Sequence, residues 1–234
     1  MPELTRHTTH RRGFLGRLAA GAAALGLGGL VTPLEAAPPP PPPTRRSGAG
    51  SNNPQFEAWL NKMTGKHKMI YDVPEPNSGF GFAWARVFLN TTNETYGTTD
   101  ADNTVVIVLR HAGIPFAMKS EMWAKYKLGD FYKINDTATS GPAVRNPFTQ
   151  AKPGDFPIPG MGVDELLAKG VLVGVCNIAL TIYSGMFAKT MGMQAEAIKS
   201  DWVANLLPGV QVVPSGVIAV NRSQEKGCAY CFAG

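Results

Sequence analysis

Two runs of apolar, mostly β-branched residues most constrain what this chain can fold into. Residues 104–109 read TVVIVL and residues 171–175 read VLVGV, and neither run alternates apolar with polar side chains. A strand buried on only one face alternates, so a continuous apolar run is typical of a strand that is covered on both faces. We therefore expect a sheet that lies between two layers of helices.

The segments around these runs alternate between strand-like and helix-like patterns. Residues 69–73 form a short apolar run that ends before Pro74, and residues 80–89 place apolar side chains at helical spacing. Further helical patterns cover residues 178–191 and 196–206, and further strand-like runs cover residues 210–213 and 217–220. Strands separated by helices favour a mainly parallel sheet, so we expect a single-domain, Rossmann-like three-layer α/β/α sandwich.

Residues 1–37 carry the pattern of a twin-arginine signal peptide. Arg11 and Arg12 precede a glycine-rich apolar stretch, and Ala36 and Ala37 are small residues of the kind a signal peptidase cuts between. The pattern predicts export through the twin-arginine translocation machinery to the periplasm. If the signal is not removed, the protein stays tethered to the membrane.

A linker is expected between the leader and the folded part. Residues 38–53 begin with six consecutive prolines and continue with Gly, Ser and Asn, a composition that cannot bury a core. The domain then spans residues 54–234. The chain has 22 basic and 17 acidic residues, a net charge of +5, and the charges are scattered. This balance gives no reason to expect a nucleic-acid partner.

The regular pattern stops between residues 133 and 159, where turn-forming residues dominate. A loop of this length inside a compact domain is uncommon and is usually either functional or disordered. We expect it to lie over the ends of the strands as a lid and to bring Arg145 to a ligand.

Chemically active side chains follow two of the predicted strands. Arg110 and His111 come after residues 104–109, and Cys176 and Asn177 come after residues 171–175. Ligands of open α/β sheets bind at the carboxyl ends of the strands, next to helix N-termini. A helix that begins near Asn177 would favour the thiolate of Cys176, and Arg110 or His111 would add to this effect.

Each of these residues has a structural alternative. Cys176 can be a small buried apolar residue, and His111 can be a core histidine bonded to the backbone. Arg110 needs an anionic partner, either an acidic side chain such as Glu75 or Glu225 or a bound anion. Ser215 is a further binding candidate near Cys176, but no Ser-His-acid arrangement supports a hydrolase.

The C-terminal tail contains Cys228 and Cys231 at Cys-x-x-Cys spacing. This spacing suits a redox-active dithiol, a local disulfide or part of a metal site. A zinc or iron–sulfur site would need Cys176, Cys228, Cys231 and His111 together. We favour redox or disulfide chemistry over metal and expect no cofactor.

Three segments resemble the DsrE/DsrF-like family of sulfur-relay proteins: residues 108–116 (VLRHAGIPF), 173–180 (VGVCNIAL) and 214–217 (PSGV). Residues 66–234 are similar to an exported branch of that family, with a comparable Cys-x-x-Cys-Phe-Ala-Gly tail. The resemblance implies an α/β/α sandwich that assembles as homotrimers or homohexamers. It also implies a persulfide on the cysteine after a central strand, a place that Cys176 matches.

These observations predict an exported thiol protein that accepts or relays sulfane sulfur on Cys176. It would be sulfurtransferase-like or a sulfur carrier, with a donor or acceptor protein as partner and with Cys228 and Cys231 as a resolving pair. The alternative is a non-catalytic periplasmic oligomer that binds a small anion or a metal. The relay members of the family are cytoplasmic, whereas this chain carries an export signal.

Overall fold

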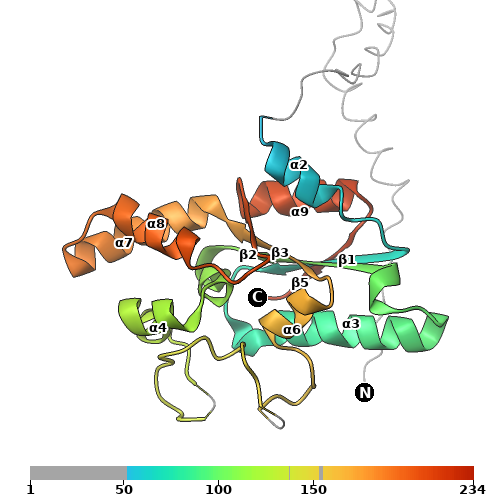
Figure 1. Ribbon diagram of the computed structural model, residues 1–234, viewed down its shortest axis with the longest axis horizontal. Coiled ribbons are helices and arrows are strands. Elements are labelled where there is room, and N and C mark those ends of the chain that lie inside the picture. The colour runs from blue at the N-terminus through green and yellow to red at the C-terminus, as the bar shows by residue number, and fades with distance from the viewer. Residues whose placement is uncertain (1–51, 137, 153–154) are drawn as a thin grey trace, which may run out of the picture. The chain divides into compact units, whose positions relative to one another are not determined.

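The computed structural model describes residues 52–136, 138–152 and 155–234, and in this part of the chain it shows one α/β/α domain around a five-stranded sheet (Figure 1). The strands are β1 (His67–Val73), β2 (Asn103–Leu109), β3 (Leu172–Cys176), β4 (Gln211–Val213) and β5 (Ala229–Phe232). Their order is β4-β3-β2-β1-β5, and every neighbouring pair is parallel. The predicted three-layer fold with a parallel sheet is confirmed.

The two continuous apolar runs form the central strands. Every residue of β2 is buried, and β3 is buried from Val173 to its end. Leu109 pairs with Val175, and Cys176 pairs with Val213 of β4. Because these strands end at nearly the same level, the residues that follow them lie close together at the carboxyl end of the sheet.

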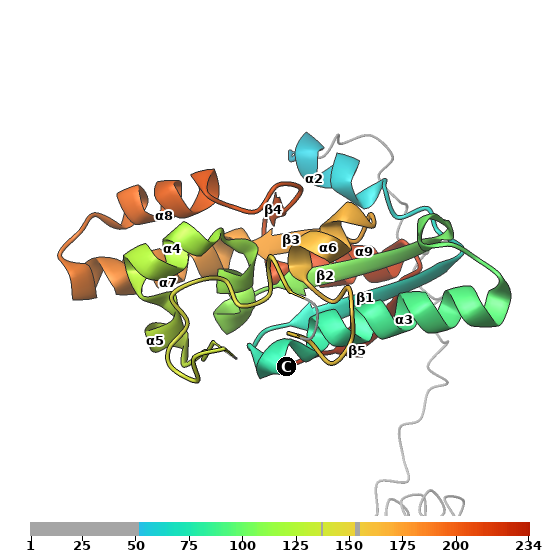
Figure 2. The same cartoon turned by 60° about the horizontal axis from the view of Figure 1, so that its bottom comes forward.

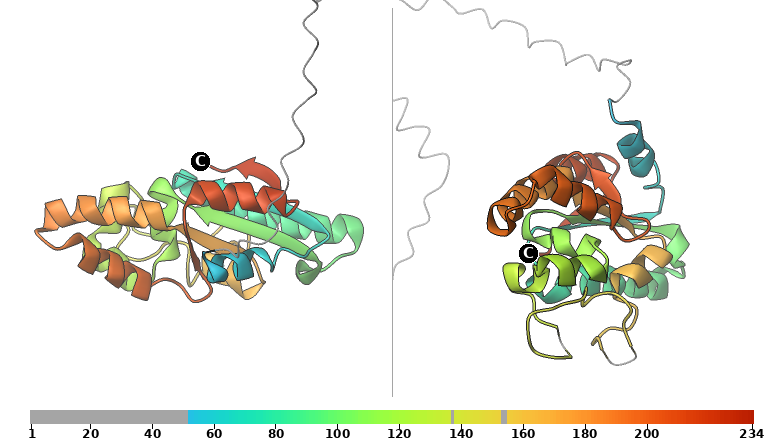
Figure 3. Two further views of the ribbon diagram at one scale, coloured as in Figure 1. Left: turned by 90° about the horizontal axis from the view of Figure 1, so that it is seen from above. Right: turned by 60° about the vertical axis from the view of Figure 1, so that its left-hand side comes forward.

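Two layers of helices cover the sheet, one on each face (Figure 1). The larger core cluster joins the sheet to α3 (Phe80–Tyr96), α4 (Ser120–Tyr126), α5 (Leu128–Tyr132), α6 (Val163–Ala168), α7 (Asn177–Met191) and α8 (Ala195–Ala204). The smaller cluster joins it to α2 (Pro54–Leu60) and α9 (Gly216–Glu225), which lie across the other face (Figure 3). Short 3₁₀ helices are η1 (Asn77–Gly79), η2 (Asp100–Asp102) and η3 (His111–Ala117).

The connections around β3 and β4 create the crevice that holds the site. The helix after β3, α7, packs into the larger core cluster, whereas the helix after β4, α9, packs into the smaller one. Neighbouring parallel strands whose following helices leave to opposite faces open a crevice at their carboxyl ends. The N-termini of α7 and α9 flank this crevice.

One sequence prediction about local structure was wrong, and one strand was not predicted. Residues 217–220 lie in α9 and not in a strand, because Ser215 caps the helix by accepting a hydrogen bond from the Ile218 backbone N–H. The tail, in turn, forms β5 and pairs with β1, so it extends the sheet. Apolar β-branched residues near a helix start resemble a strand, and only the cap distinguishes them.

The predicted leader, residues 1–37, lies outside the described residues. Residues 38–51 of the predicted linker lie outside them too. α2 begins at Pro54, with Asn53 as its N-terminal cap. Among the residues that the structure describes, no helix has both the length and the apolar character needed to cross a bilayer.

Substituting two glycines should change stability in opposite directions. A Cβ on Gly113 would collide with the carbonyl oxygen of Val73, so Gly113→Ala should lower the free energy of unfolding by about 2 kcal/mol. Gly185 lies in α7 with open space around it, so Gly185→Ala should raise that free energy by about 0.5–1 kcal/mol. Urea unfolding of both variants measures this, and equal midpoints would contradict the close approach at Gly113.

Candidate functional site

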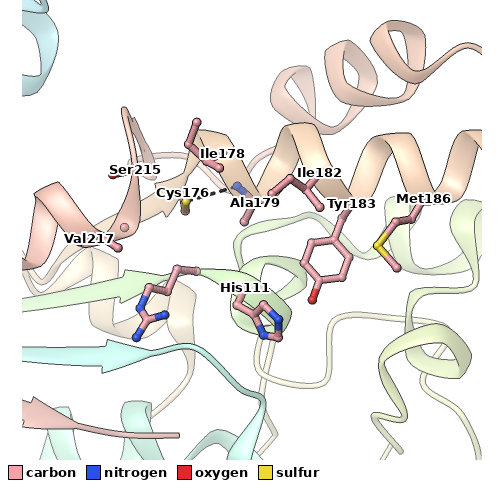
Figure 4. Close-up of a pocket in the computed structure, with 11 residues that line it drawn as sticks. His111, Cys176, Ile178, Ala179, Ile182, Tyr183, Met186, Ser215 and Val217 are labelled. Atoms are coloured by element: carbon pink, nitrogen blue, oxygen red, sulfur yellow. Dashed lines mark hydrogen bonds between the residues drawn. The ribbon is translucent and has the colours of Figure 1, made fainter.

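A pocket of about 370 Å³ opens at the carboxyl end of the sheet, between the starts of α7 and α9 (Figure 4). Its walls come from the residues after β2, from one side of α7 and from the turn before α9. The lining residues are Arg110, His111, Cys176, Ile178, Ala179, Ile182, Tyr183, Met186, Ser215, Gly216 and Val217.

Cys176 is at once the last residue of β3 and the N-terminal cap of α7. Its Sγ accepts a hydrogen bond from the Ala179 backbone N–H at 3.3 Å, and its side chain is almost fully buried. An N–H donor and the positive end of a helix dipole both favour negative charge on the sulfur. The thiol is therefore buried and polarised at once.

Arg110 is held by a buried carboxylate that the sequence analysis overlooked. Its Nε and Nη2 donate to the two carboxylate oxygens of Asp72, at 2.7 and 2.9 Å, and the Tyr230 hydroxyl donates to the same carboxylate at 2.9 Å. The expected acidic partner is present, but it is Asp72 and not Glu75 or Glu225, because β1 lies beside β2 and brings Asp72 next to the strand end. An acidic residue inside the apolar run 69–73 was the available signal.

The Asp72 pair largely compensates the charge of Arg110. Hydrogen bonding to Asp72 raises the pKa of Arg110 above its ordinary value, and charges on Tyr230 and Cys176 act in the same direction. Burial, followed by the Asp72 hydrogen bond, raises the pKa of Tyr230. The stem of Arg110 lies against Gly216, where an added Cβ would be 2.6 Å from the Arg110 Cβ. Position 216 at the start of α9 therefore has to be glycine, because any larger side chain there would overlap the stem of Arg110.

His111 lies at the rim of the pocket and is not a core histidine. Its Nδ1 is 2.8 Å from Oε1 of Glu75, and both side chains are exposed. Its ring meets the edge of the Tyr183 ring, with the centroids 5.7 Å apart. The residue has a φ of 47°, in the left-handed region, so the chain turns sharply after β2 and directs the imidazole toward α7.

The other predicted binding residues are divided between the pocket and the rest of the domain. Ser215 lines the pocket and caps α9, whereas Asn177 opens α7 but does not line the pocket. Arg145 does not line it either: its Nε donates to Asp136 at 2.7 Å, and this bond lowers the pKa of the Asp136 carboxyl.

The lid prediction for residues 133–159 was wrong for this pocket. None of the lining residues comes from that segment. Its described part packs against the domain instead: the Phe148 ring contacts Phe82 and Phe116, and the buried Asn146 amide donates to the carbonyls of Phe116 and Met118. Burial of one aromatic ring and one satisfied amide explains why this irregular segment is anchored beside α3 and η3.

The two tail cysteines are separated by the sheet. Cys228 belongs to the core cluster beneath α9, whereas Cys231 packs against the opposite cluster, opposite Tyr71 of β1. Side chains three positions apart on an extended strand point to opposite faces. All three thiols of the chain are free, and neither tail thiol lines the pocket. Burial raises the pKa of both tail thiols.

The alternative metal site is not assembled by this fold. Cys176 is at the carboxyl end of β3, while Cys228 and Cys231 are on β5 or directly before it, at the far edge of the sheet. Within the described ranges, no group of three or more His, Cys, Asp or Glu residues is placed to hold a metal ion. The proposed donor set of Cys176, Cys228, Cys231 and His111 therefore does not fit a metal in this arrangement.

No family model matches the chain, and no curated protein matches it. Among solved structures, the chain is similar to MTH1491 from Methanobacterium thermoautotrophicum, described as a protein of unknown function, with 17% identity and a TM-score of 0.35. The match covers 71% of this chain and 99% of the other.

Removing the charge of Asp72 should cost more stability than removing one of its hydrogen bonds. Asp72→Asn leaves Arg110 facing a neutral amide, so we expect the free energy of unfolding to fall by about 2–3 kcal/mol. Tyr230→Phe deletes a single hydroxyl and should cost about 1 kcal/mol. Chemical denaturation of both single variants and the double variant measures this, and additive losses would show that the three groups do not act as one network.

Proposed function

We propose that this protein is a thiol-based sulfur carrier whose Cys176 accepts sulfane sulfur. The Cys176 thiolate attacks the outer sulfur of a persulfide donor, R–S–SH, and forms a new S–S bond. The donor's own S–S bond breaks, and the donor leaves as a thiolate that takes up a proton. No external oxidant is needed, because the zero-valent sulfur moves from one thiol to another.

The single observation that carries this proposal is the position of Cys176. It is the one cysteine that lines this pocket, and its sulfur already accepts an N–H at the start of α7. The same N–H groups would stabilise the charge of a Cys176 persulfide, and the second helix start at Ser215 adds a further positive dipole end. The apolar walls restrict the access of water to the bound sulfur.

Release of the sulfur requires a thiol from outside the pocket. Cys228 and Cys231 do not line the pocket, and burial raises their pKa, so they are not placed to resolve a persulfide on Cys176. An acceptor thiolate attacks the outer sulfur of Cys176–S–SH, takes it, and restores the Cys176 thiol. The acceptor is a second protein or a small thiol.

An apolar surface at the pocket mouth suits such a protein partner. Ile178, Ile182 and Met186 recur every four residues along α7, and all three are exposed, as is Val217 on α9 (Figure 4). Exposed apolar side chains gathered around a pocket are typical of a docking surface. We propose that the sulfur donor or acceptor binds here, and that the protein acts in the periplasm after export as a homotrimer or homohexamer.

The second candidate is a non-catalytic protein that holds a small anion in the same pocket. The N-termini of α7 and α9 favour anion binding, because their free N–H groups and dipoles attract negative charge. The Asp72–Arg110 pair opposes it, because both Nε and Nη2 of Arg110 already bind the carboxylate. Competition between inorganic sulfate and thiol labelling of Cys176 would reveal such binding.

Polysulfide should load sulfur onto Cys176 in preference to the tail cysteines. The reduced full chain is incubated with sodium tetrasulfide, alkylated and analysed by peptide mass spectrometry. We expect one added sulfur atom or more on the peptide that contains Cys176, and none there in Cys176→Ser. The tail peptide with Cys228 and Cys231 is the internal control. An unmodified Cys176 in folded, reduced protein would sink the proposal.

A carboxylate at the pocket wall should slow this loading. Ile182→Glu introduces a negative charge at the mouth, and repulsion of anionic polysulfide should reduce the rate about 3- to 10-fold. Val203→Glu is the matched control, since Val203 is also exposed but lies on α8 and does not line the pocket. Equal rates for the two variants would mean that polysulfide does not reach Cys176 through this mouth.

A further inference from the structure

The outer edge of the sheet at β5 is unusually unprotected. β5 pairs with β1 on one side and has no strand on its other side within the described part of the chain. Its four residues, Ala229–Phe232, include no proline and no charged side chain. Proteins usually block an edge strand with such residues, because free N–H and C=O groups recruit another strand.

The hydrogen bonds to β1 define which backbone groups face outward. The Ala233 N–H donates to the carbonyl of Asp72, so the N–H and C=O groups of Ala233, Cys231 and Ala229 point toward β1. The N–H and C=O groups of the alternate residues, Tyr230 and Phe232, therefore point away from the domain. They form a ladder that is ready to pair with a further strand.

Apolar side chains flank this ladder on both faces of the sheet. Tyr230 and Phe232 belong to β5, and Phe80, Trp84 and Val87 are exposed residues of α3, which covers the opposite face of the sheet; their exposed fractions lie between 36% and 54%. α3 runs beside β5 (Figure 2), since a Cβ on Gly81 would lie 3.4 Å from that of Ala233. The four half-exposed aromatic side chains offer roughly 400 Å². That is about half of the ~800 Å² per partner of a standard interface.

We propose that this edge binds a second copy of the chain, with β5 pairing antiparallel to β5 of the other copy across a two-fold axis. The surface is self-complementary, as a two-fold contact requires, because it presents alternating donors and acceptors with apolar flanks and no charge on the strand. The two sheets join into one continuous sheet. The exposed α3 residues Phe80, Trp84 and Val87 of the two copies cover one face of the junction, and Tyr230 and Phe232 of the two copies cover the other.

The register follows from the two outward-facing residues. With the axis at Cys231, Tyr230 of each copy faces Phe232 of the other, and both residues exchange both of their hydrogen bonds. An axis at Tyr230 or at Phe232 would pair only one outward-facing residue within the strand. The chosen register makes Cys231 face Cys231 of the second copy as a non-hydrogen-bonded pair. Their Cα atoms are then about 4.5 Å apart, within the range of a disulfide.

Disulfide trapping tests this register directly. Diamide accepts the two hydrogen atoms that are released when two thiols join, so treatment of the full chain should give a covalent dimer on a non-reducing denaturing gel. Cys231→Ser should abolish the dimer, whereas Cys176→Ser and Cys228→Ser should leave it unchanged. A cross-link that survives Cys231→Ser, or none at all while Cys231 still reacts with a maleimide, would overturn the register.

Sedimentation velocity tests the contact without oxidant. Phe232→Lys places a charge at the junction and should weaken self-association at least tenfold, whereas Val144→Lys, at an exposed apolar residue elsewhere, should not. A dimer or a hexamer with two-fold axes, dissociated by Phe232→Lys and not by Val144→Lys, is the expected result. A trimer or a monomer has no two-fold axis, so either of those states overturns the proposal. Sulfur loading on Cys176 is measured separately, and neither result depends on the other.

Discussion

The buried carboxylate of Asp72 ties together the elements that surround the site. It lies on β1, binds the guanidinium of Arg110 after β2, and accepts the hydroxyl of Tyr230 on β5. The stem of Arg110 in turn passes the backbone of Gly216 at the start of α9. One carboxylate thus fixes the relative positions of three strand segments and one helix start. A buried charge is tolerated at this place only because both of its oxygens have partners.

The crevice at β3 and β4 determines what the fixed groups can do. Because α7 and α9 leave to opposite faces, their first turns meet at one pocket with Cys176 and Ser215 as caps. The positive charge near the sulfur comes mainly from these helix starts, since Asp72 already compensates Arg110. Helix dipoles and a capping N–H act at short range, so they stabilise a negative charge on the sulfur itself. They attract dissolved anions less strongly than an unpaired arginine would. That difference favours thiol chemistry over anion storage.

The sequence predicted what depends on short-range pattern. Unbroken apolar runs identified β2 and β3, and the position of Cys176 between strand and helix followed from them. The pattern could not show pairings between distant segments. Asp72 meets Arg110 only because β1 lies beside β2, and the tail becomes β5 only because the edge of β1 is free to receive it. The Val217 to Val220 run was misassigned because β-branched residues occur both in strands and at some helix starts. The hydrogen bond by which Ser215 caps the helix forms only in the folded chain, so residue composition did not reveal it.

The fold places the two exposed apolar surfaces at different parts of the sheet. The pocket mouth lies at β3 and β4, whereas β5 is at the opposite edge, three strands from β3, or about 14 Å at ordinary strand spacing. A second copy bound at β5 would therefore leave the pocket open to the proposed sulfur donor. Tyr230 belongs to both regions, since its backbone faces the free edge while its hydroxyl binds Asp72. Pairing at the edge would hold that tyrosine in place and, through Asp72, would hold Arg110 beside the pocket.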